Sequence, residues 1–259
     1  MKSIDDHSID MILCDLPYGM TACKWDSVIP LDLLWEQYKR IITHHGVIIL
    51  TGSQPFTSKL VMSNPKWFKY EIIWEKDNCT NFMNAKKMIL KVHENICIFY
   101  KSKITYNPQK FFKGIYKKGK DRIIERGDVY NNKKRTDVGS VDGLRYPRSV
   151  QRFNSEKGLH PTQKPVKLFE WLIKTYTNEG MIVLDNCAGS GTTAIACMNT
   201  NRNYILIEQD EKYFNICQER IANFKSYIPI KHEKKNQNSC PQGQLDIFNL
   251  SQNYAWSET

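Results

Sequence analysis

The sequence lacks the features of a membrane or secreted protein. No apolar run approaches the roughly 18 residues that a membrane-spanning helix needs, and the polar start MKSIDDHSID has no apolar core of a secretion signal. The eight cysteines form no CxxC pair, so a zinc cluster is not expected. Several cysteines lie inside apolar runs, which favours reduced core thiols in a cytoplasmic protein.

Positive charge, by contrast, is abundant and unevenly placed. The chain has 259 residues, enough for one large α/β domain or two small ones, and its formal net charge is +10. Residues 101–150 alone contain 14 Lys and Arg against 5 Asp and Glu. Such a localised positive field suits a polyanion, with nucleic acid as the first candidate and a solvated lysine-rich loop as the alternative.

Short apolar runs alternate with segments of helical period. The runs IDMILCD (9–15) and VIILTG (47–52) read as buried strands, and LDLLWEQYKRII (31–42) between them reads as an amphipathic helix. The alternation resumes after residue 150. Continuously apolar strands are typical of a parallel sheet covered on both faces. We therefore predict an α/β fold with a mostly parallel sheet and helices on both faces.

A glycine-rich turn follows the predicted strand MIVLD (181–185). Gly189 and Gly191 permit a tight turn and the close approach of a ligand, and the helix that follows offers unpaired amides. Glu208 ends the next predicted strand, where a carboxylate can accept both hydroxyls of a ribose. The turn alone is compatible with a nicotinamide cofactor, with S-adenosylmethionine or with no ligand. A P-loop is not expected, because no Gly-Lys-Ser/Thr follows.

The second unusual strand end is Asp15-Leu16-Pro17-Tyr18. In an open parallel sheet it would lie at the same carboxyl edge as the glycine turn. The Asp15 carboxylate and the Leu16 carbonyl, turned outward by Pro17, could accept the two N–H groups of an exocyclic amine. These acceptors would localise the nitrogen lone pair for attack on a sulfonium methyl group. Tyr18 would stack on the base after it had left the duplex. This combination favours methyl transfer to a flat, amino-bearing base.

Three motifs resemble those of the amino-group DNA methyltransferases. DLPYG (15–19) resembles their (D/N/S)PPY motif, LDNCAGSGTT (184–193) resembles DPFxGSGTT, and HPTQKP (160–165) is nearly identical to a further motif. Their order resembles the beta group of this family. The resemblance implies a Rossmann-like methyltransferase fold with circularly permuted motif order. It also implies a site-specific, S-adenosylmethionine-dependent enzyme that acts on double-stranded DNA.

The resemblance assigns roles to individual residues. The target base would be held by Asp15, Leu16, Pro17 and Tyr18. The cofactor would be bound by Asp185, Asn186, Cys187, Ala188, Gly189, Ser190, Gly191, Thr192, Thr193, Glu208, His160, Thr162, Lys164 and Pro165. DNA contacts are expected from Lys117, Lys118, Lys133, Lys134, Arg135, Arg145 and Arg148.

The same reading divides the chain into four parts. These are a catalytic half (1–100), a basic target-recognition insert (101–150), a cofactor-binding half (151–227) and a flexible C-terminal tail (228–259). In the tail, QLDIF (Gln244–Phe248) resembles the short peptide that binds the bacterial sliding clamp. The alternative is that this segment packs on the protein itself as an edge strand. The resemblance further implies a nucleoid-associated restriction-modification enzyme of a bacterium or phage, in a group that includes homodimers.

The chain also departs from the family pattern. Leu16 replaces the usual second Pro, but only its carbonyl is needed, so activity should survive. Asn186 and Cys187 replace Pro-Phe and should loosen packing against the cofactor. The family's strand and Gly-Asp motif ahead of the catalytic strand are not found in residues 1–8. We therefore expect a less enclosed adenine pocket or a true start further upstream.

The identity of the target base follows only from the resemblance. An acid at the first motif position is more usual among adenine enzymes, so adenine N6 is the expected target. The alternatives are cytosine N4, an RNA substrate, a dinucleotide-dependent oxidoreductase and a non-catalytic DNA-binding relative.

Overall fold

The computed structural model divides the chain into two compact units, Met1–Asn107 with Ser149–Thr259, and Pro108–Arg148. The second unit falls within the range predicted as the target-recognition insert. The structure describes residues 1–20, 23, 26–114, 142–156, 158–159 and 162–224, and the backbone of 123–124, 135–136 and 244–249. Within the described residues, none of the helices has the length and apolar character required to cross a bilayer.

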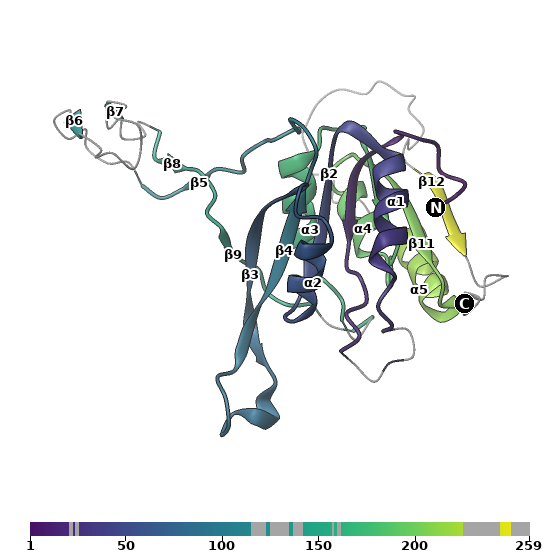
Figure 1. Cartoon of the computed structure of the whole chain (residues 1–259), viewed down its shortest axis with the longest axis horizontal. Coiled ribbons are helices and arrows are strands. Elements are labelled where there is room, and N and C mark those ends of the chain that lie inside the picture. Colours follow the sequence, from purple (N-terminus) through teal and green to yellow (C-terminus); the bar gives the residue numbers. More distant parts are fainter. Residues whose placement is uncertain are drawn as a thin grey trace. The chain divides into compact units, whose positions relative to one another are not determined.

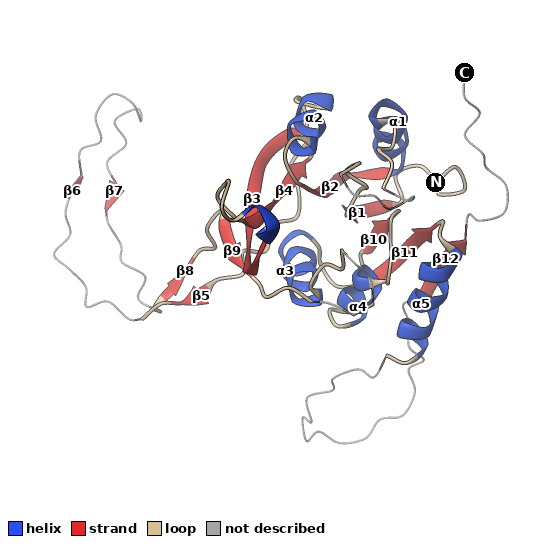
Figure 2. Cartoon of the chain, turned by 90° about the horizontal axis from the view of Figure 1, so that it is seen from below, coloured by secondary structure: helices blue, strands red, loops and turns tan. Residues whose placement is uncertain are grey.

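An eight-stranded sheet runs through the larger unit (Figures 1 and 2). In spatial order its strands are β12 (Gln244–Asn249), β11 (Asn203–Glu208), β10 (Ile182–Asp185), β1 (Ile9–Cys14), β2 (Ile42–Gly52), β4 (Lys91–Phe99), β3 (Phe68–Thr80) and β9 (Val150–Arg152). Neighbouring strands pair in parallel except at β4, which is antiparallel to both β2 and β3. The prediction of a mostly parallel sheet is therefore confirmed.

Helices cover both faces of this sheet, as predicted (Figure 2). On one face lie α1 (Leu31–Ile41) and α2 (Phe56–Ser63), and on the other lie α3 (Val166–Tyr176), α4 (Thr192–Met198) and α5 (Glu211–Ala222). The central strand β1 serves both cores. Met11 and Leu13 point to the α3 side and Ile12 and Cys14 to the α1 side, all fully buried. This two-sided burial explains why the strand is continuously apolar.

The carboxyl edge of the sheet gathers the acidic residues. Asp15 follows β1, Asp185 ends β10 and Glu208 ends β11, and these three strands are parallel neighbours. Because β4 is antiparallel, the turn that joins β3 to β4 leaves from this same edge, where Gly52 pairs with Asn95. The edge therefore carries both the strand-end carboxylates and the base of the β3–β4 hairpin.

Much of the predicted flexible tail lies outside the described residues. Its one described part, Gln244–Asn249, pairs in parallel with β11 as the edge strand β12, which is the alternative expected for QLDIF. The tail prediction for the remaining residues between 228 and 259 stays a prediction.

The smaller unit contains two short antiparallel pairs. β5 (Phe111–Phe112) pairs with β8 (Leu144–Arg145), and β6 (Ile123–Ile124) pairs with β7 (Arg135–Thr136). Lys110 Nζ lies 4.7 Å from the centroid of the Tyr146 ring. This cation–π contact and the β5–β8 pair stabilise the part of the unit formed by residues 110–112 and 144–146.

Candidate active site

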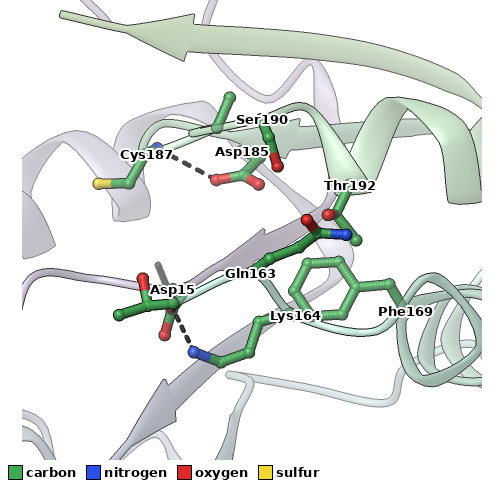
Figure 3. Close-up of a pocket in the computed structure, with 10 residues that line it drawn as sticks. Asp15, Gln163, Lys164, Phe169, Asp185, Cys187, Ser190 and Thr192 are labelled. Carbon is green, nitrogen blue, oxygen red and sulfur yellow. Dashed lines mark hydrogen bonds and ion pairs between the residues drawn. The ribbon is translucent and has the colours of Figure 1, made fainter. Parts of the chain in front are cut away.

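One cavity joins the three sequence motifs (Figure 3). Its lining comes from all three motifs and from α3: Asp15, Thr162, Gln163, Lys164, Phe169, Asp185, Cys187, Ala188, Ser190 and Thr192. The motifs meet because β1 and β10 are adjacent parallel strands, so their carboxyl ends lie side by side. The segment that precedes α3 closes the cavity with the Gln163 and Lys164 side chains.

Asp15 accepts hydrogen bonds from three different elements. The Tyr18 hydroxyl lies 2.5 Å from Oδ1, and the Thr51 hydroxyl of β2 donates to the same oxygen. Lys164 Nζ donates to Oδ2 at 2.5 Å. The Asp15 side chain is 20% exposed, whereas Lys164 is only 6% exposed. These contacts fix the orientation of a carboxylate that still reaches the cavity.

Lys164 connects Asp15 to a second carboxylate, Glu94 of β4. Its Nζ lies 3.3 Å from Glu94 Oε2, and Lys76 of β3 forms an ion pair with the other oxygen of Glu94. Burial opposes the charge on Lys164, but Asp15 and Glu94 outweigh it and raise the Lys164 pKa. Burial likewise opposes the charge on Glu94, but Lys164 and Lys76 lower the Glu94 pKa. A chain of alternating charges thus runs from the cavity to the β3–β4 hairpin.

The aromatic ring of the DLPY segment packs against a second aromatic ring. Tyr18 stacks on Phe56 of α2, with ring centroids 5.1 Å apart and an interplanar angle of 29°. Burial and the Asp15 carboxylate raise the pKa of Tyr18 well above its ordinary value, so its hydroxyl remains a neutral donor. Leu16 is 3% exposed and belongs to the core between the sheet and α1. The fold therefore accommodates Leu16 at this position, where the family usually has Pro, because the side chain is apolar and buried.

Two carboxylates hold the glycine-rich turn. Asp185 accepts from the Cys187 backbone N–H at 3.1 Å and from the Thr193 hydroxyl at 2.5 Å. Glu208 accepts from the Gly189 backbone N–H at 2.7 Å. Burial raises the pKa of Asp185 to about 6 and also raises the pKa of Glu208. Both acids therefore sit where a cationic or hydroxyl-bearing ligand would offset their desolvation.

Gly191 is required by backbone conformation and by packing. It has φ +77°, and a Cβ at this position would lie 2.5 Å from Cys217 Sγ of α5. Gly180 has a similar φ of +80° but no atom within 4 Å of the corresponding Cβ position. The two glycines therefore share the conformational cost of substitution but not the steric cost.

Gly191→Ala is expected to lower the free energy of unfolding by about 2–4 kcal/mol, from left-handed strain and overpacking together. The matched variant Gly180→Ala should lose only about 1–2 kcal/mol, from backbone strain alone. Urea denaturation followed by circular dichroism measures both values. Equal losses in the two variants would contradict the packing argument.

The family assignment follows from comparison with known proteins. The model of the family described as DNA methylase matches residues 9–219, which include all three motifs. This chain belongs to the DNA methylase family. The methylase is 26% identical to Type II methyltransferase M.HpaI of Haemophilus parainfluenzae over 268 residues, covering 95% of its own chain and 78% of M.HpaI.

Two further comparisons extend this result. The methylase is 28% identical to the DNA adenine methyltransferase YhdJ of Escherichia coli K12, covering 85% of its own chain and 79% of YhdJ. It aligns with the crystal structure of the M1.HpyAVI–SAM complex at a TM-score of 0.56 and 26% identity, covering 82% of its own chain and 89% of that chain. The predicted Rossmann-like methyltransferase fold is confirmed. The methylase is an S-adenosylmethionine-dependent enzyme that methylates an amino group of DNA, at adenine N6 or cytosine N4.

Most of the predicted cofactor residues line the cavity or belong to the glycine-rich turn and the hydrogen bonds that hold it. The Asn186 side chain accepts from the Tyr38 hydroxyl of α1 at 2.6 Å, and Pro165 immediately precedes α3. His160 lies outside the described residues. Lys164, predicted to bind the cofactor, lines the cavity and pairs with Asp15 and Glu94, and its role in cofactor binding stays a prediction.

The predicted DNA contacts are largely untested by the structure. Lys117, Lys118, Lys133 and Lys134 lie outside the described residues, and only the backbone of Arg135 is described, in β7. Arg145 lies in β8 and Arg148 ends the smaller unit.

Sequence reasoning missed Thr51, Glu94 and Lys76. Thr51 lies near the end of β2, the strand next to β1, so its position at the carboxyl edge was a usable signal. Glu94 lies inside β4, just ahead of the apolar run Ile96–Phe99 in HENICIFYK, so an acid preceding a buried run was a usable signal. No sequence signal links Lys76 to Glu94 across the hairpin.

Proposed function

We propose that the methylase transfers a methyl group to adenine N6 in double-stranded DNA, with Asp15 as the residue that accepts from the reacting amine. The observation that carries this proposal is the position of Asp15, fixed by Tyr18, Thr51 and Lys164 on the wall of the cavity that also contains Asp185. The acid at the first motif position and the similarity to an adenine methyltransferase favour adenine over cytosine.

In this proposal the DLPY segment binds the reacting amine. Asp15 and the Leu16 carbonyl accept its two N–H groups, which concentrates the lone pair on nitrogen. Tyr18, supported by Phe56, provides a flat surface for the base. S-adenosylmethionine, held by the Asp185 turn and Glu208, would supply the methyl group for the new N–C bond, and its sulfur would keep the electron pair of the broken C–S bond. Asp15 is placed to take the proton that the nitrogen then releases.

The residues of the glycine-rich turn fit the cofactor in their chemistry. S-adenosylmethionine supplies an electrophilic methyl group on a sulfonium centre. The buried Asp185 carboxylate suits its ammonium group, and Glu208 suits the ribose hydroxyls. Gly189 and Gly191 adopt left-handed conformations and have no side chains, so that a ligand can approach the backbone of this turn.

Affinity for S-adenosylmethionine is expected to decrease as the pH falls through about 6. The pKa of Asp185 is raised to about 6, so below this pH the neutral acid predominates and no longer pairs with the ligand ammonium. The dissociation constant should rise by up to about tenfold per pH unit below that value. Calorimetric titrations between pH 5 and 8 measure it. Asp185→Asn should bind weakly with no such dependence, and a flat wild-type profile would contradict the assignment.

Smaller-unit residues are proposed to select the DNA sequence. The support is their charge, because residues 101–150 carry most of the excess Lys and Arg of the chain.

Clamp binding through Gln244–Phe248 would require release of β12 from β11. Equal clamp binding by a protein truncated before residue 244 would exclude it.

Genomic sequencing with a method that detects modified bases tests the proposed function. Host cells that lack other DNA methyltransferases are compared with and without the expressed methylase. We expect N6-methyladenine in one sequence context, and none in cells that express Asp15→Ala. N4-methylcytosine instead would overturn the adenine assignment, and an unmodified genome with stably folded protein would overturn the proposed activity.

A further inference from the structure

The β3–β4 hairpin extends beyond the other strands of the sheet (Figure 1). The strands remain paired as far as Thr80 and Lys91, and a short 3-10 turn, Phe82–Asn84, forms the tip. The tip is ordered by local bonds: Asn84 Nδ2 donates to Asn81 Oδ1 at 2.6 Å, and Asn81 adopts a left-handed conformation with φ 68°. The arm therefore presents its tip in a defined conformation.

Large apolar side chains cover this tip without burial. Met83 and Ile89 are each 95% exposed, Phe82 is 75% exposed and Met88 is 56% exposed. We call these four residues the apolar tip. Four large apolar side chains exposed within eight residues at the end of a projecting arm indicate a binding surface rather than scattered surface residues.

Exposed positive charge lies beside the apolar tip at Lys86 and Lys87, whereas Lys76 pairs with Glu94 and Lys91 donates to Ser53. Between residues 76 and 91 the hairpin contains four lysines and one aspartate, and Lys86 and Lys87 are exposed beside the tip. A DNA duplex offers the complementary combination, with phosphates outside and stacked apolar base faces inside. Charge and apolar character together therefore favour DNA as the occupant.

The hairpin is connected to the cavity. The hairpin projects from the carboxyl edge of the sheet. Ion pairs of Lys76 with Glu94, of Glu94 with Lys164 and of Lys164 with Asp15 connect the sheet end of the hairpin to the cavity wall. DNA that delivers a base to Asp15 must pass along this edge. The arm therefore lies where the remaining duplex must be accommodated.

We propose that the apolar tip inserts into the base stack beside the target base and occupies the space that the base leaves when it enters the cavity. This inference rests on the proposed methylation of a duplex base. Unstacking a base costs a few kcal/mol, and an apolar side chain inserted at that step offsets part of the cost. Lys86 and Lys87 hold the flanking phosphates.

The test uses the full chain with the triple variant Phe82→Ser/Met83→Ser/Ile89→Ser. Met62→Ser/Leu33→Ser is the control, because Met62 on α2 and Leu33 on α1 are also exposed, at 71% and 49%. Both proteins are assayed for methyl transfer on a duplex containing the modified genomic sequence, and on the same duplex with a mismatch opposite the target base. Fluorescence of 2-aminopurine at the target position reports unstacking, and sedimentation reports the oligomeric state.

We expect the triple variant to lose about tenfold or more in kcat/KM on the matched duplex, with weaker 2-aminopurine fluorescence, because unstacking is no longer offset. The mismatched duplex should restore most of the rate, and the control should behave as wild type.

Equal losses on both duplexes, or no loss, would overturn the proposal while leaving the methylase activity established. If the wild type is a dimer and the triple variant is a monomer, the tip is a dimer contact and the proposal is overturned. If the triple variant loses binding to anionic vesicles without an effect on DNA, the tip binds lipid and the proposal is likewise overturned. An inactive wild type would refute the proposed function first, and the inference with it.

Discussion

Asp15→Ala is expected to lower the kcat of methyl transfer by about 10²- to 10⁴-fold, the effect of losing a positioned proton acceptor. The variant removes the only side-chain acceptor assigned to the target amine, so the nitrogen lone pair stays delocalised into the ring. Binding of S-adenosylmethionine should remain close to wild type, because its proposed contacts come from the Asp185 turn. Transfer of labelled methyl groups to DNA and calorimetric binding of the cofactor separate the two effects.

Loss of Asp15 also alters the ion-pair chain, so a control is needed. Asp15→Asn retains one acceptor oxygen and should keep more activity than Asp15→Ala, which has none. Asp15→Ala/Lys164→Met removes the lysine that would otherwise lose one of its two carboxylate partners. If both alanine variants turn over at the wild-type rate, the role assigned to Asp15 is wrong.

Lys164→Met is expected to lower the free energy of unfolding by about 3–5 kcal/mol near neutral pH, the range for removing one partner of a buried ion pair. Lys164 is 6% exposed and lies between Asp15 and Glu94, so its loss leaves two carboxylates facing each other without their common cation. Chemical denaturation monitored by tryptophan fluorescence measures the loss.

The pH dependence of this variant gives a second readout. In the wild type the pKa of Glu94 is lowered in the folded state. Glu94 therefore adds to the free energy of unfolding above its ordinary pKa of 4.5, and this contribution is lost as the pH falls through the folded pKa. In Lys164→Met the folded pKa of Glu94 should rise instead. The stability difference between variant and wild type should therefore shrink as the pH is lowered.

A double variant provides the control for Lys164. Lys164→Met/Glu94→Gln removes one of the two carboxylates that lose Lys164 and should recover part of the lost stability, because the introduced amide carries no charge to desolvate. Lys76→Met should cost less than Lys164→Met, since Glu94 then keeps Lys164 as a partner. Additive losses in the double variant would show that the ion-pair chain is not coupled.

The positions of Asp15, Asp185 and Glu208 were predictable because each follows or ends a continuously apolar run. Parallel strands bring their carboxyl ends to one edge, so local periodicity was sufficient to place these acids together. The pairing of Lys164 with Asp15 was not predictable in this way. It depends on how the segment before α3 crosses the ends of β1 and β10, and no local pattern specifies that path.

The sequence by itself determined the order of strands and helices, the strand ends that carry acids, and the basic segment, because periodicity and charge are local properties of the chain. Only the tertiary structure decided which side chains complete the charge network and which apolar residues remain exposed. Phe82 and Met83 are large apolar residues, but the hairpin carries them away from both cores. Burial depends on contacts between distant segments, and these exist only once the chain has folded.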